Sequence, residues 1–381
     1  MTTTATAWTA NDRNRSWSSP DQDDAALNFH RTLTGYEPTA LIELPELARE
    51  LGVAAVFAKD ESTRLGMPAF KALGASWAVH RALEEAQADT DAEVVTATDG
   101  NHGRAVARFA REAGRSARIF VPAGDIHPSA VAAIRGEAAE VVELDANYDA
   151  TVAAADEYAA ANNAVLVQDT AWDGYEEVPG WIVDGYSTLF REIDTQLKEA
   201  GHHAPDLITV PTGVGSLLQA ALAHYRRESA GDDASGAGEA GAVDTAVGTA
   251  VDTAVVSVET EAAACMGPSL EACHPVTVET GKTIMSGLNC GTPSSLAWPL
   301  VRDGLDAAVT VSDAAAIDAA HRLAGLGVAA GPCGAASLAG VREALTGAEA
   351  EVRRRHLGVG SGSVIVLTVT EGSAANPVPE A

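Results

Sequence analysis

The 381-residue sequence is poor in aromatic residues, positive charge, cysteine and long hydrophobic runs. Lys and Arg number 25 against 53 Asp and Glu, a formal net charge of −28, so nucleic acid and anionic membrane surfaces are not expected partners. Four cysteines do not make a disulfide framework in a chain of this length. There is no run of about 18 apolar residues to span a bilayer. Residues 1–24 have no apolar signal-peptide core, so we expect a cytoplasmic protein.

The composition also bounds the size and the setting of the fold. Hydrophobic residues make up 46% of the chain and charged residues 20%, so a sizeable core is expected and global disorder is disfavoured. The length favours two lobes or one large α/β body. The excess of carboxylates favours a salt-rich cytosol, where ions screen charge repulsion, and hence a halophilic source. An ordinary acidic cytosolic protein is the alternative.

Short apolar, β-branched runs alternate with alanine-rich helical patterns along most of the chain. This alternation predicts an α/β fold with doubly wound, mostly parallel sheets, because crossover helices join parallel strands and cover both of their faces. Strands are expected at 53–59, 93–98, 117–121, 141–144, 164–168, 207–211, 255–259 and 364–370, and helices at 72–88, 103–113, 150–161 and 216–228.

Residues 229–254 interrupt the alternation. They include no aromatic residue and no large aliphatic residue except Val, so the segment can bury little area against the entropy of ordering it. We expect a flexible acidic surface insertion, with a short helix as the alternative. Residues 1–24 are also expected to be loosely held.

A glycine-rich motif, Thr212-Gly213-Val214-Gly215-Ser216-Leu217, follows the run at 207–211 and precedes a helical pattern. Its glycines let the backbone approach an anion, and the amides of the helix start point toward that anion. No lysine follows and the full dinucleotide pattern is missing, so this is not a Walker loop. The motif predicts a site for the phosphate of an organic cofactor, with a plain tight turn as the alternative.

Lys71 stands at the start of a predicted helix, with Ala69, Phe70, Ala72 and Leu73 around it. A lysine in apolar surroundings can act as an amine nucleophile toward an aldehyde. On these residues alone, a lysine that extends from the helix start into water is the stronger alternative.

Polar residues follow three further apolar runs. Asp99 and Asn101 follow 93–98, Asp169 follows 164–168, and Thr370 ends the last run. A capped turn is the alternative for Asp99 and Asn101. Because open α/β sheets bind ligands at the carboxyl ends of their strands, we expect these side chains to share one crevice. The combination of an amine, a phosphate loop and a base for a Cα proton suits pyridoxal phosphate.

The sequence also resembles diaminopropionate ammonia-lyase, a fold-type-II pyridoxal-phosphate family related to threonine dehydratase and threonine synthase. The matching stretches are AFKALGASWA around Lys71, ATDGNHGR at 97–104, VQDTAWDGYEEVPGWIVDGY at 167–186, GVGSLLQA at 213–220, residues 35–62 and the tail VIVLTVTEG. The resemblance covers most of residues 30–375. Dehydratases usually carry Ser where Ala69 and Asp99 stand, and both differences favour the diaminopropionate branch.

The resemblance implies a tryptophan-synthase-β-like fold in two lobes and a homodimer. A large cofactor-binding domain is expected at 1–75 and 180–381, with the flexible insertion inside it, and a smaller substrate-side domain at 76–179. Lys71 would bind the cofactor covalently beside Phe70, and Asn101 would donate a hydrogen bond to its phenolic oxygen. The phosphate would be held by Gly213, Val214, Gly215 and Ser216.

The resemblance also implies the reaction, the elimination of D- and L-2,3-diaminopropionate to pyruvate and two ammonia. Asp99 would be the Cα base for the D-substrate and Asp169 the base for the L-substrate. Thr370, or else Thr368, would face the pyridine nitrogen. Because a neutral partner there makes a weaker electron sink than a carboxylate, it favours β-elimination over transamination.

One departure concerns the loop Gly331-Pro332-Cys333-Gly334-Ala335, where Pro332 replaces an acidic residue of the family. Two alternatives remain open. One is a threonine or serine dehydratase or another β-eliminating or β-replacing enzyme of the fold. The other, suggested by the Pro332 change, is a catalytically idle protein that binds the cofactor or an amino acid. Cys265 and Cys290 resemble a family cysteine pair, and two thiols are expected in a reducing cytosol. The spacing of Cys273 and His274 matches no zinc pattern, so no metal is expected.

Overall fold

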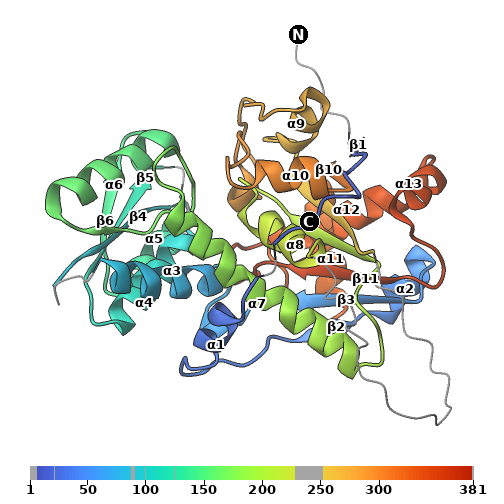
Figure 1. Ribbon diagram of the computed structural model, residues 1–381, viewed down its shortest axis with the longest axis horizontal. Coiled ribbons are helices and arrows are strands. Elements are labelled where there is room, and N and C mark those ends of the chain that lie inside the picture. The colour runs from blue at the N-terminus through green and yellow to red at the C-terminus, as the bar shows by residue number, and fades with distance from the viewer. Residues whose placement is uncertain are drawn as a thin grey trace, which may run out of the picture.

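The computed structural model describes residues 7–20, 22–86, 91–98, 100–124, 126–227 and 252–379. Its strands form a seven-stranded and a four-stranded sheet, each flanked by helices (Figure 1). The strands are β1 (Trp8–Ala10), β2 (Leu41–Glu43), β3 (Ala55–Asp60), β4 (Val94–Ala97), β5 (Ala117–Pro122), β6 (Glu140–Leu144), β7 (Val165–Leu166), β8 (Leu207–Pro211), β9 (Ala254–Thr260), β10 (Ala307–Val311) and β11 (Val364–Val369).

The helices of the described residues connect these strands and cover the sheets. They are α1 (Ala25–His30), α2 (Pro45–Leu51), α3 (Lys71–Glu85), α4 (Asn101–Glu112), α5 (Pro128–Gly136), α6 (Tyr148–Asn162), α7 (Glu177–Glu199), α8 (Ser216–Tyr225), α9 (Met266–Ala272), α10 (Trp298–Gly304), α11 (Asp313–Gly325), α12 (Pro332–Leu345) and α13 (Ala350–Leu357), with short 3-10 turns η1 (Arg64–Gly66) and η2 (Ser286–Leu288). None of these helices has the length and apolar content required to cross a bilayer.

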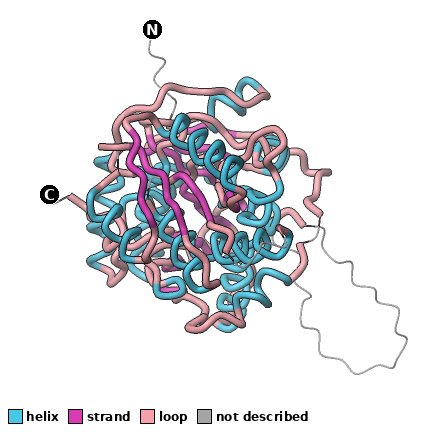
Figure 2. The backbone as a smooth tube through the Cα atoms, turned by 90° about the vertical axis from the view of Figure 1, so that its left-hand side faces the viewer, coloured by secondary structure: helices cyan, strands magenta, loops and turns pink. Residues whose placement is uncertain are grey.

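The larger sheet has the strand order β1-β10-β9-β8-β11-β3-β2. Its five inner strands are parallel, and β1 and β2 pair antiparallel at the two edges. The smaller sheet has the order β6-β5-β4-β7 and is entirely parallel. Figure 2 shows strands lying between layers of helix, as the α/β expectation requires. The doubly wound, mostly parallel fold expected from the sequence is therefore confirmed.

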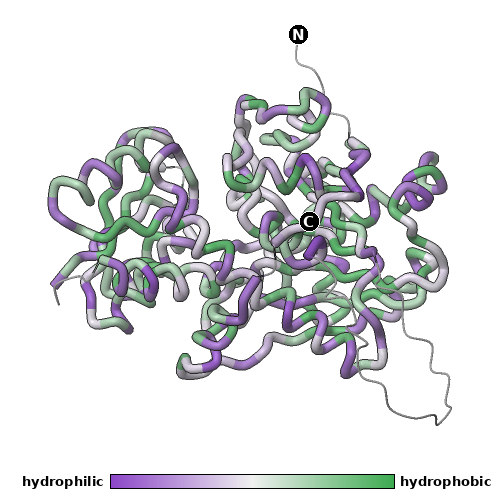
Figure 3. The backbone as a smooth tube through the Cα atoms, in the orientation of Figure 1, coloured by the Kyte–Doolittle hydropathy of each residue, from purple (hydrophilic) through white to green (hydrophobic). Residues whose placement is uncertain are grey.

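The strands carry most of the hydrophobic stretches of the chain, and helices shield them from solvent (Figure 3). In β4, β8 and β9 every residue is buried. Such strands show no apolar–polar alternation because both faces are covered. The sequence predicts the long inner strands for this reason, and the predicted ends lie within two residues of those in the structure.

Three strands were not expected from the sequence. β1 and β2 have three residues each, too few to show a pattern, and β10 reads AAVTV within an alanine-rich region. The expectation that residues 1–24 are loosely held is also wrong for the described part of that segment. β1 pairs with β10, and the largely buried Arg13 side chain forms an ion pair with Asp306 (Nε–Oδ1 2.8 Å).

The predicted insertion at 229–254 lies outside the described residues up to position 251. Its last three residues are part of the fold. Asp252 pairs with Arg13 and Arg15, and Ala254 is the first residue of β9. The segment that lacks core-forming residues is therefore shorter than predicted, because Thr253 and Ala254 are already buried.

Close packing between α3 and α7 positions the start of α3. A Cβ atom on Gly74 would lie 2.5 Å from Cε1 of Tyr186, and one on Gly185 would lie 2.6 Å from the carbonyl oxygen of Leu73. Only glycine fits at both contacts. The 23-residue helix α7 extends from the smaller sheet to the larger one (Figure 1). The first residue of α3, Lys71, is thus held between the two sheets.

Candidate active site

The side chain of Lys71 donates a hydrogen bond to a carboxylate that the chain brings from far away in sequence. Its Nζ lies 2.8 Å from Oδ2 of Asp169, which follows β7. The two side chains are 22% and 12% exposed, so the pair is largely withdrawn from water but still accessible. The rings of Phe70 and Tyr186 flank the amine, with Nζ 5.5 and 5.9 Å from their centroids.

Asp169 is ionised at neutral pH. Burial alone would raise its pKa, but the nearby His102 and Lys71, together with the hydrogen bond from Lys71, lower the pKa of Asp169 to about 2. Burial also lowers the pKa of His102, so its imidazole is neutral at pH 7. The ammonium group of Lys71 is therefore the cation that keeps Asp169 charged under those conditions.

The orientation of His102 follows from its hydrogen bond to the carbonyl oxygen of Val167 (Nε2–O 2.9 Å). Because a carbonyl only accepts, Nε2 carries the hydrogen and Nδ1 of the neutral ring is bare. Nδ1 lies 3.9 Å from Oδ2 of Asp169 and has no hydrogen-bond partner among the residues that the structure describes. His102 thus adds a buried proton acceptor beside the pair of Lys71 and Asp169.

The glycine-rich loop lies next to the same carboxylate residue. The Ser216 hydroxyl donates to the backbone oxygen of Asp169 (3.4 Å). Gly215 has φ of +106°, and a Cβ there would lie 3.0 Å from Cβ of Ala297. A Cβ on Gly213 would lie 2.9 Å from the Gly287 oxygen. Both glycines are therefore required by conformation or space.

The end of β11 completes the site. The backbone N–H of Phe70 donates to the carbonyl of Thr370 (3.0 Å), and Nδ2 of Asn101 donates to Oε2 of Glu371 (2.8 Å). The Thr368 hydroxyl instead donates to the Thr209 carbonyl inside the sheet (2.7 Å). Of the two threonines considered from the sequence, Thr370 is therefore the one next to the lysine segment.

The structure brings the described members of the predicted set into one chain of contacts. This chain links Ser216 to Asp169 and Asp169 to Lys71, while Phe70 contacts the end of β11. Asp99 lies outside the described residues, so its prediction rests on the sequence. Val214 lies in the same loop, where its carbonyl accepts from the backbone N–H of Ser294 (2.8 Å).

The remaining sequence candidates have other positions. Pro332 is the first residue of α12. Cys265 and Cys290 are not joined by a disulfide in the described structure, and the Cys265 thiol donates to the Cys290 carbonyl (3.5 Å). Within the described ranges, no group of three or more His, Cys, Asp or Glu side chains is arranged to hold a metal ion.

Two residues of the site received no role from the sequence, His102 and Glu371. Both stand inside motifs that the sequence analysis singled out, directly after Asn101 and Thr370. Position after an apolar strand is the signal that could have found them. What the sequence does not show is their burial, which makes both of them nearly inaccessible to water.

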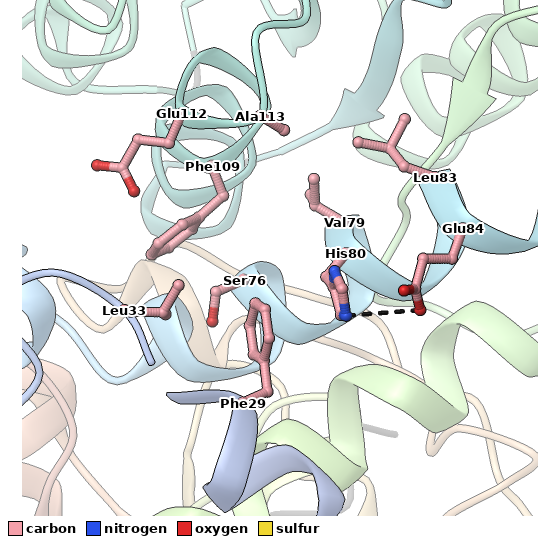
Figure 4. Close-up of a pocket in the computed structure, with 10 residues that line it drawn as sticks. All are labelled: Phe29, Leu33, Ser76, Val79, His80, Leu83, Glu84, Phe109, Glu112 and Ala113. Atoms are coloured by element: carbon pink, nitrogen blue, oxygen red, sulfur yellow. Dashed lines mark ion pairs between the residues drawn. The ribbon is translucent and has the colours of Figure 1, made fainter. Parts of the chain in front are cut away.

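A separate cavity of about 380 Å³ lies between α1, α3 and α4 (Figure 4). Its walls are the apolar side chains of Phe29, Leu33, Val79, Leu83 and Phe109. His80 and Glu84 form an ion pair at its edge (3.5 Å). None of the predicted site residues lines this cavity, so it is distinct from the candidate active site.

The geometry fits the cofactor expected from the sequence. The start of α8 directly follows the glycine-rich loop and, like the starts of most described helices, has no side-chain cap. Its first-turn amides have no intrahelical acceptors and so can bind the oxygens of a phosphate. Lys71 supplies an amine with an anionic acceptor, Asp169, in contact. Phosphate loop, amine and base are the three elements that pyridoxal phosphate requires.

Comparisons with known proteins agree with this geometry. The family model described as pyridoxal-phosphate dependent enzyme matches residues 32–370. A diaminopropionate ammonia-lyase of Salmonella typhimurium is 34% identical over 312 residues, which cover 75% of this chain and 72% of that protein. The same-named protein of Escherichia coli strain K12 is 34% identical over 315 residues, 78% of this chain and 74% of that one.

A solved structure of similar fold extends the match over nearly the whole chain. The diaminopropionate ammonia lyase of Escherichia coli, in complex with an aminoacrylate-PLP azomethine reaction intermediate, superposes with a TM-score of 0.81 and 29% identity. The alignment covers 96% of this chain and 93% of that chain.

Proposed function

The chain belongs to the family of pyridoxal-phosphate dependent enzymes, and from that premise we propose that it is a carbon–nitrogen lyase that eliminates ammonia from 2,3-diaminopropionate. The observation that carries the proposal is the contact chain from the uncapped start of α8 through Asp169 to Lys71. These contacts support a shared role for the glycine-rich loop as phosphate site, Asp169 as base and Lys71 as amine. The overall reaction converts one diaminopropionate and one water to pyruvate and two ammonia.

Each residue of the proposed site has its own role in the reaction. Lys71 holds the cofactor covalently through Nζ, and residues 213–216 bind its phosphate. Bound pyridoxal phosphate withdraws electrons from the Cα atom of an attached amino acid, which makes the Cα proton acidic. Asp169 accepts this proton from one face, because it is ionised at neutral pH. Asp99 accepts it from the opposite face for the other enantiomer. Asn101 and Thr370 bind the ring.

Engagement of Lys71 also changes the base. In the cofactor-free protein the ammonium group of Lys71 neutralises Asp169 at 2.8 Å. While Nζ is bound to the cofactor, the free ammonium group would be absent, and the pKa of Asp169 would be higher than in the cofactor-free protein. The bare Nδ1 of His102 at 3.9 Å would be a second acceptor for a proton taken up by Asp169.

An assay of 2-oxo acid release from D- and L-diaminopropionate, serine and threonine in concentrated salt tests the proposed reaction. Diaminopropionate and serine would give pyruvate, and threonine would give 2-oxobutanoate. We expect pyruvate from both diaminopropionate isomers at a higher kcat/KM than from serine. Turnover of threonine or serine without turnover of diaminopropionate would instead assign a dehydratase. The observation that favours a dehydratase is Pro332, which stands where diaminopropionate ammonia-lyases have an acidic residue.

We also propose a two-domain, homodimeric, cytoplasmic enzyme that works at high salt. The four strands of the smaller sheet fall within 76–179 and the seven strands of the larger sheet fall outside it, which supports the division into domains. The net charge of −28 supports the salt requirement. Light scattering tests the homodimer, and a monomer would contradict it. Thermal melts over a salt series test the salt requirement, and a melting temperature that does not fall in dilute buffer would contradict it.

A further inference from the structure

Glu371 connects the two sheets at the candidate active site. It follows β11 of the larger sheet, and its side chain is buried. Oε2 accepts from Nδ2 of Asn101 (2.8 Å), the first residue of α4 beside the smaller sheet. Oε1 accepts from the backbone N–H of Cys333 in the first turn of α12 (3.2 Å). One carboxylate therefore links three segments that are distant in sequence.

The backbone around Glu371 holds that carboxylate in place. Glu371 forms a bridge with Ala69, two residues before Lys71, and its carbonyl accepts from the N–H of Gly331 (3.0 Å). A Cβ on Gly331 would lie 3.0 Å from Oε1, and a Cβ on Gly334 would lie 2.7 Å from the Glu371 carbonyl oxygen. Neighbouring glycines thus let the surrounding backbone close around this residue.

The hydrogen bonds around Glu371 fit an ionised carboxylate. Burial raises the pKa of Glu371, and hydrogen bonds from the side chain and backbone of Cys333 and from the side chains of Asn101 and Asn376 oppose this rise. All of these groups donate. Because an ionised carboxylate only accepts, Asn101 must direct its Nδ2 rather than its Oδ1 toward Glu371. The charge on Glu371 therefore determines the orientation of the Asn101 amide.

We propose that Glu371 is a positioning residue for the cofactor, which holds the Asn101 amide across the junction of the two sheets in the orientation that binds the cofactor ring. The proposal rests on the proposed function, which gives Asn101 its contact with the ring. Glu371 acts through Asn101 and touches no reacting atom itself. Loss of its charge would free the amide to rotate, even though every other cofactor contact remains.

A double-mutant cycle on cofactor binding tests this role. Cofactor-free wild-type protein, Glu371→Gln, Asn101→Ala and the double variant are titrated with pyridoxal phosphate in concentrated salt, and the visible absorbance band is recorded over a pH series. We expect Glu371→Gln to weaken binding by about tenfold to a hundredfold, the range for a hydrogen bond to a charged group, and to shift the pH dependence of the band. In the Asn101→Ala background the same change should weaken binding by less than about threefold.

The matched control is Asp306→Asn. Asp306 is also a buried carboxylate, accepting from Arg13, Arg226 and the N–H of Val255. It precedes β10, at the amino ends of the parallel strands, whereas Glu371 follows β11, at their carboxyl ends. Its loss should lower thermal stability and leave the band and its pH dependence unchanged. If Glu371→Gln does not fold, Glu371→Asp takes its place in the cycle. Its side chain is one methylene too short to keep the bond to Asn101, so binding should weaken by a similar factor, but the pH dependence of the band should stay that of the wild type because the charge is kept.

Two results would overturn the proposal: unchanged cofactor binding in the Glu371 variant, or equal weakening with and without Asn101. The measurement uses no substrate. A wild-type protein that binds pyridoxal phosphate but releases no pyruvate from diaminopropionate therefore contradicts the proposed function alone, and the cycle still decides the role of Glu371.

Discussion

The chain withdraws two lysines from water and pairs each with a carboxylate, but the two pairs differ in how completely their charges are matched. Lys59, in β3, is fully buried, and its Nζ donates to Oε2 of Glu192 (2.6 Å), the Thr39 carbonyl (2.8 Å) and Oε1 of Gln196 (2.9 Å). Lys71 is partly exposed, and its carboxylate partner lies beside an imidazole nitrogen of His102 that has no hydrogen-bond partner in the described part of the chain.

A second cation, Arg64, completes the Lys59 cluster, which consists of Lys59, Glu61, Arg64 and Glu192. Arg64 donates to Glu61 (2.6 Å) and to both carboxylate oxygens of Glu192 (2.7 Å each), so two cations balance two anions away from solvent. Each ammonium hydrogen of Lys59 already has an acceptor. A saturated cluster of this kind holds β3 to α7 and has no group left for chemistry. The Lys71 pair keeps the accessibility that a substrate requires.

Replacing Lys71 with Ala should have the largest effect on function. The variant loses the amine that binds the cofactor, so turnover should fall by more than about 10³-fold and the visible band that borohydride fixes to the protein should disappear. Absorbance before and after borohydride, with mass spectrometry of the reduced protein, is the measurement. Lys198→Met, at an exposed position of α7, is the control and should keep the band. A normal, reducible band in Lys71→Ala would place the amine elsewhere.

The two proposed bases should separate the enantiomers. The D- and L-substrates, held by the same carboxylate contacts, present the Cα hydrogen to opposite faces of the cofactor. Asp99→Asn should therefore reduce turnover of D-diaminopropionate by about 10²–10⁴-fold and spare the L-isomer, and Asp169→Asn should do the reverse. Pyruvate release from each isomer by each variant checks this. Equal losses on both isomers would reject the assignment and point to Lys71 as the shared base.

Comparison of the two lysines also shows where sequence reasoning stops. The chain has four lysines, Lys59, Lys71, Lys198 and Lys282, and both Lys59 and Lys71 stand next to apolar residues. Apolar neighbours alone therefore do not single out the proposed catalytic lysine. Its position in a motif does, because Lys71 stands at the start of a helix, whereas Lys59 lies within β3.

The same limit applies to the rest of the fold and the site. Inner strands such as β8 are predictable because both of their faces are buried. Asp169 could be singled out because it follows an apolar run in the sequence, although the strand there, β7, is only half-buried. Edge strands such as β1 depend on pairing with a distant strand, and the bond between Asn101 and Glu371 joins residues 270 positions apart. Contacts at that separation leave no local pattern.

A substitution in the Lys59 cluster should lower the stability of the fold and leave cofactor binding intact. Lys59→Met removes one cation from a buried, balanced group and leaves an excess negative charge, so the free energy of unfolding should fall by about 3–5 kcal/mol. Denaturant unfolding measures the loss, and Lys198→Met is again the control. The folded fraction of Lys59→Met should still show the cofactor band of the wild type. Loss of the band from folded protein would mean that the two clusters are not separate in function.

The smallest expected effect is the contribution of the Lys71–Asp169 pair to stability. The pKa of Asp169 falls from 3.8 in the unfolded chain to about 2 in the folded protein. A carboxylate with a lowered pKa binds fewer protons when folded, so its stabilisation is fully present above pH 3.8 and is lost as the pH falls toward 2. The shift is equivalent to about 2 kcal/mol, below the loss expected at Lys59.

The difference in unfolding free energy between cofactor-free wild type and Asp169→Asn isolates this contribution, because the other acidic residues titrate in both proteins. In concentrated salt the pH-dependent part of this difference should be constant near neutral pH and shrink by about 2 kcal/mol between pH 4 and pH 2. Lys71→Ala should reduce the shrinkage, because it removes the ammonium group and the hydrogen bond that, together with His102, lower the pKa of Asp169. A difference that does not vary with pH would mean that Asp169 is not held ionised by its neighbours, and the contrast with the closed Lys59 cluster would then rest on exposure alone.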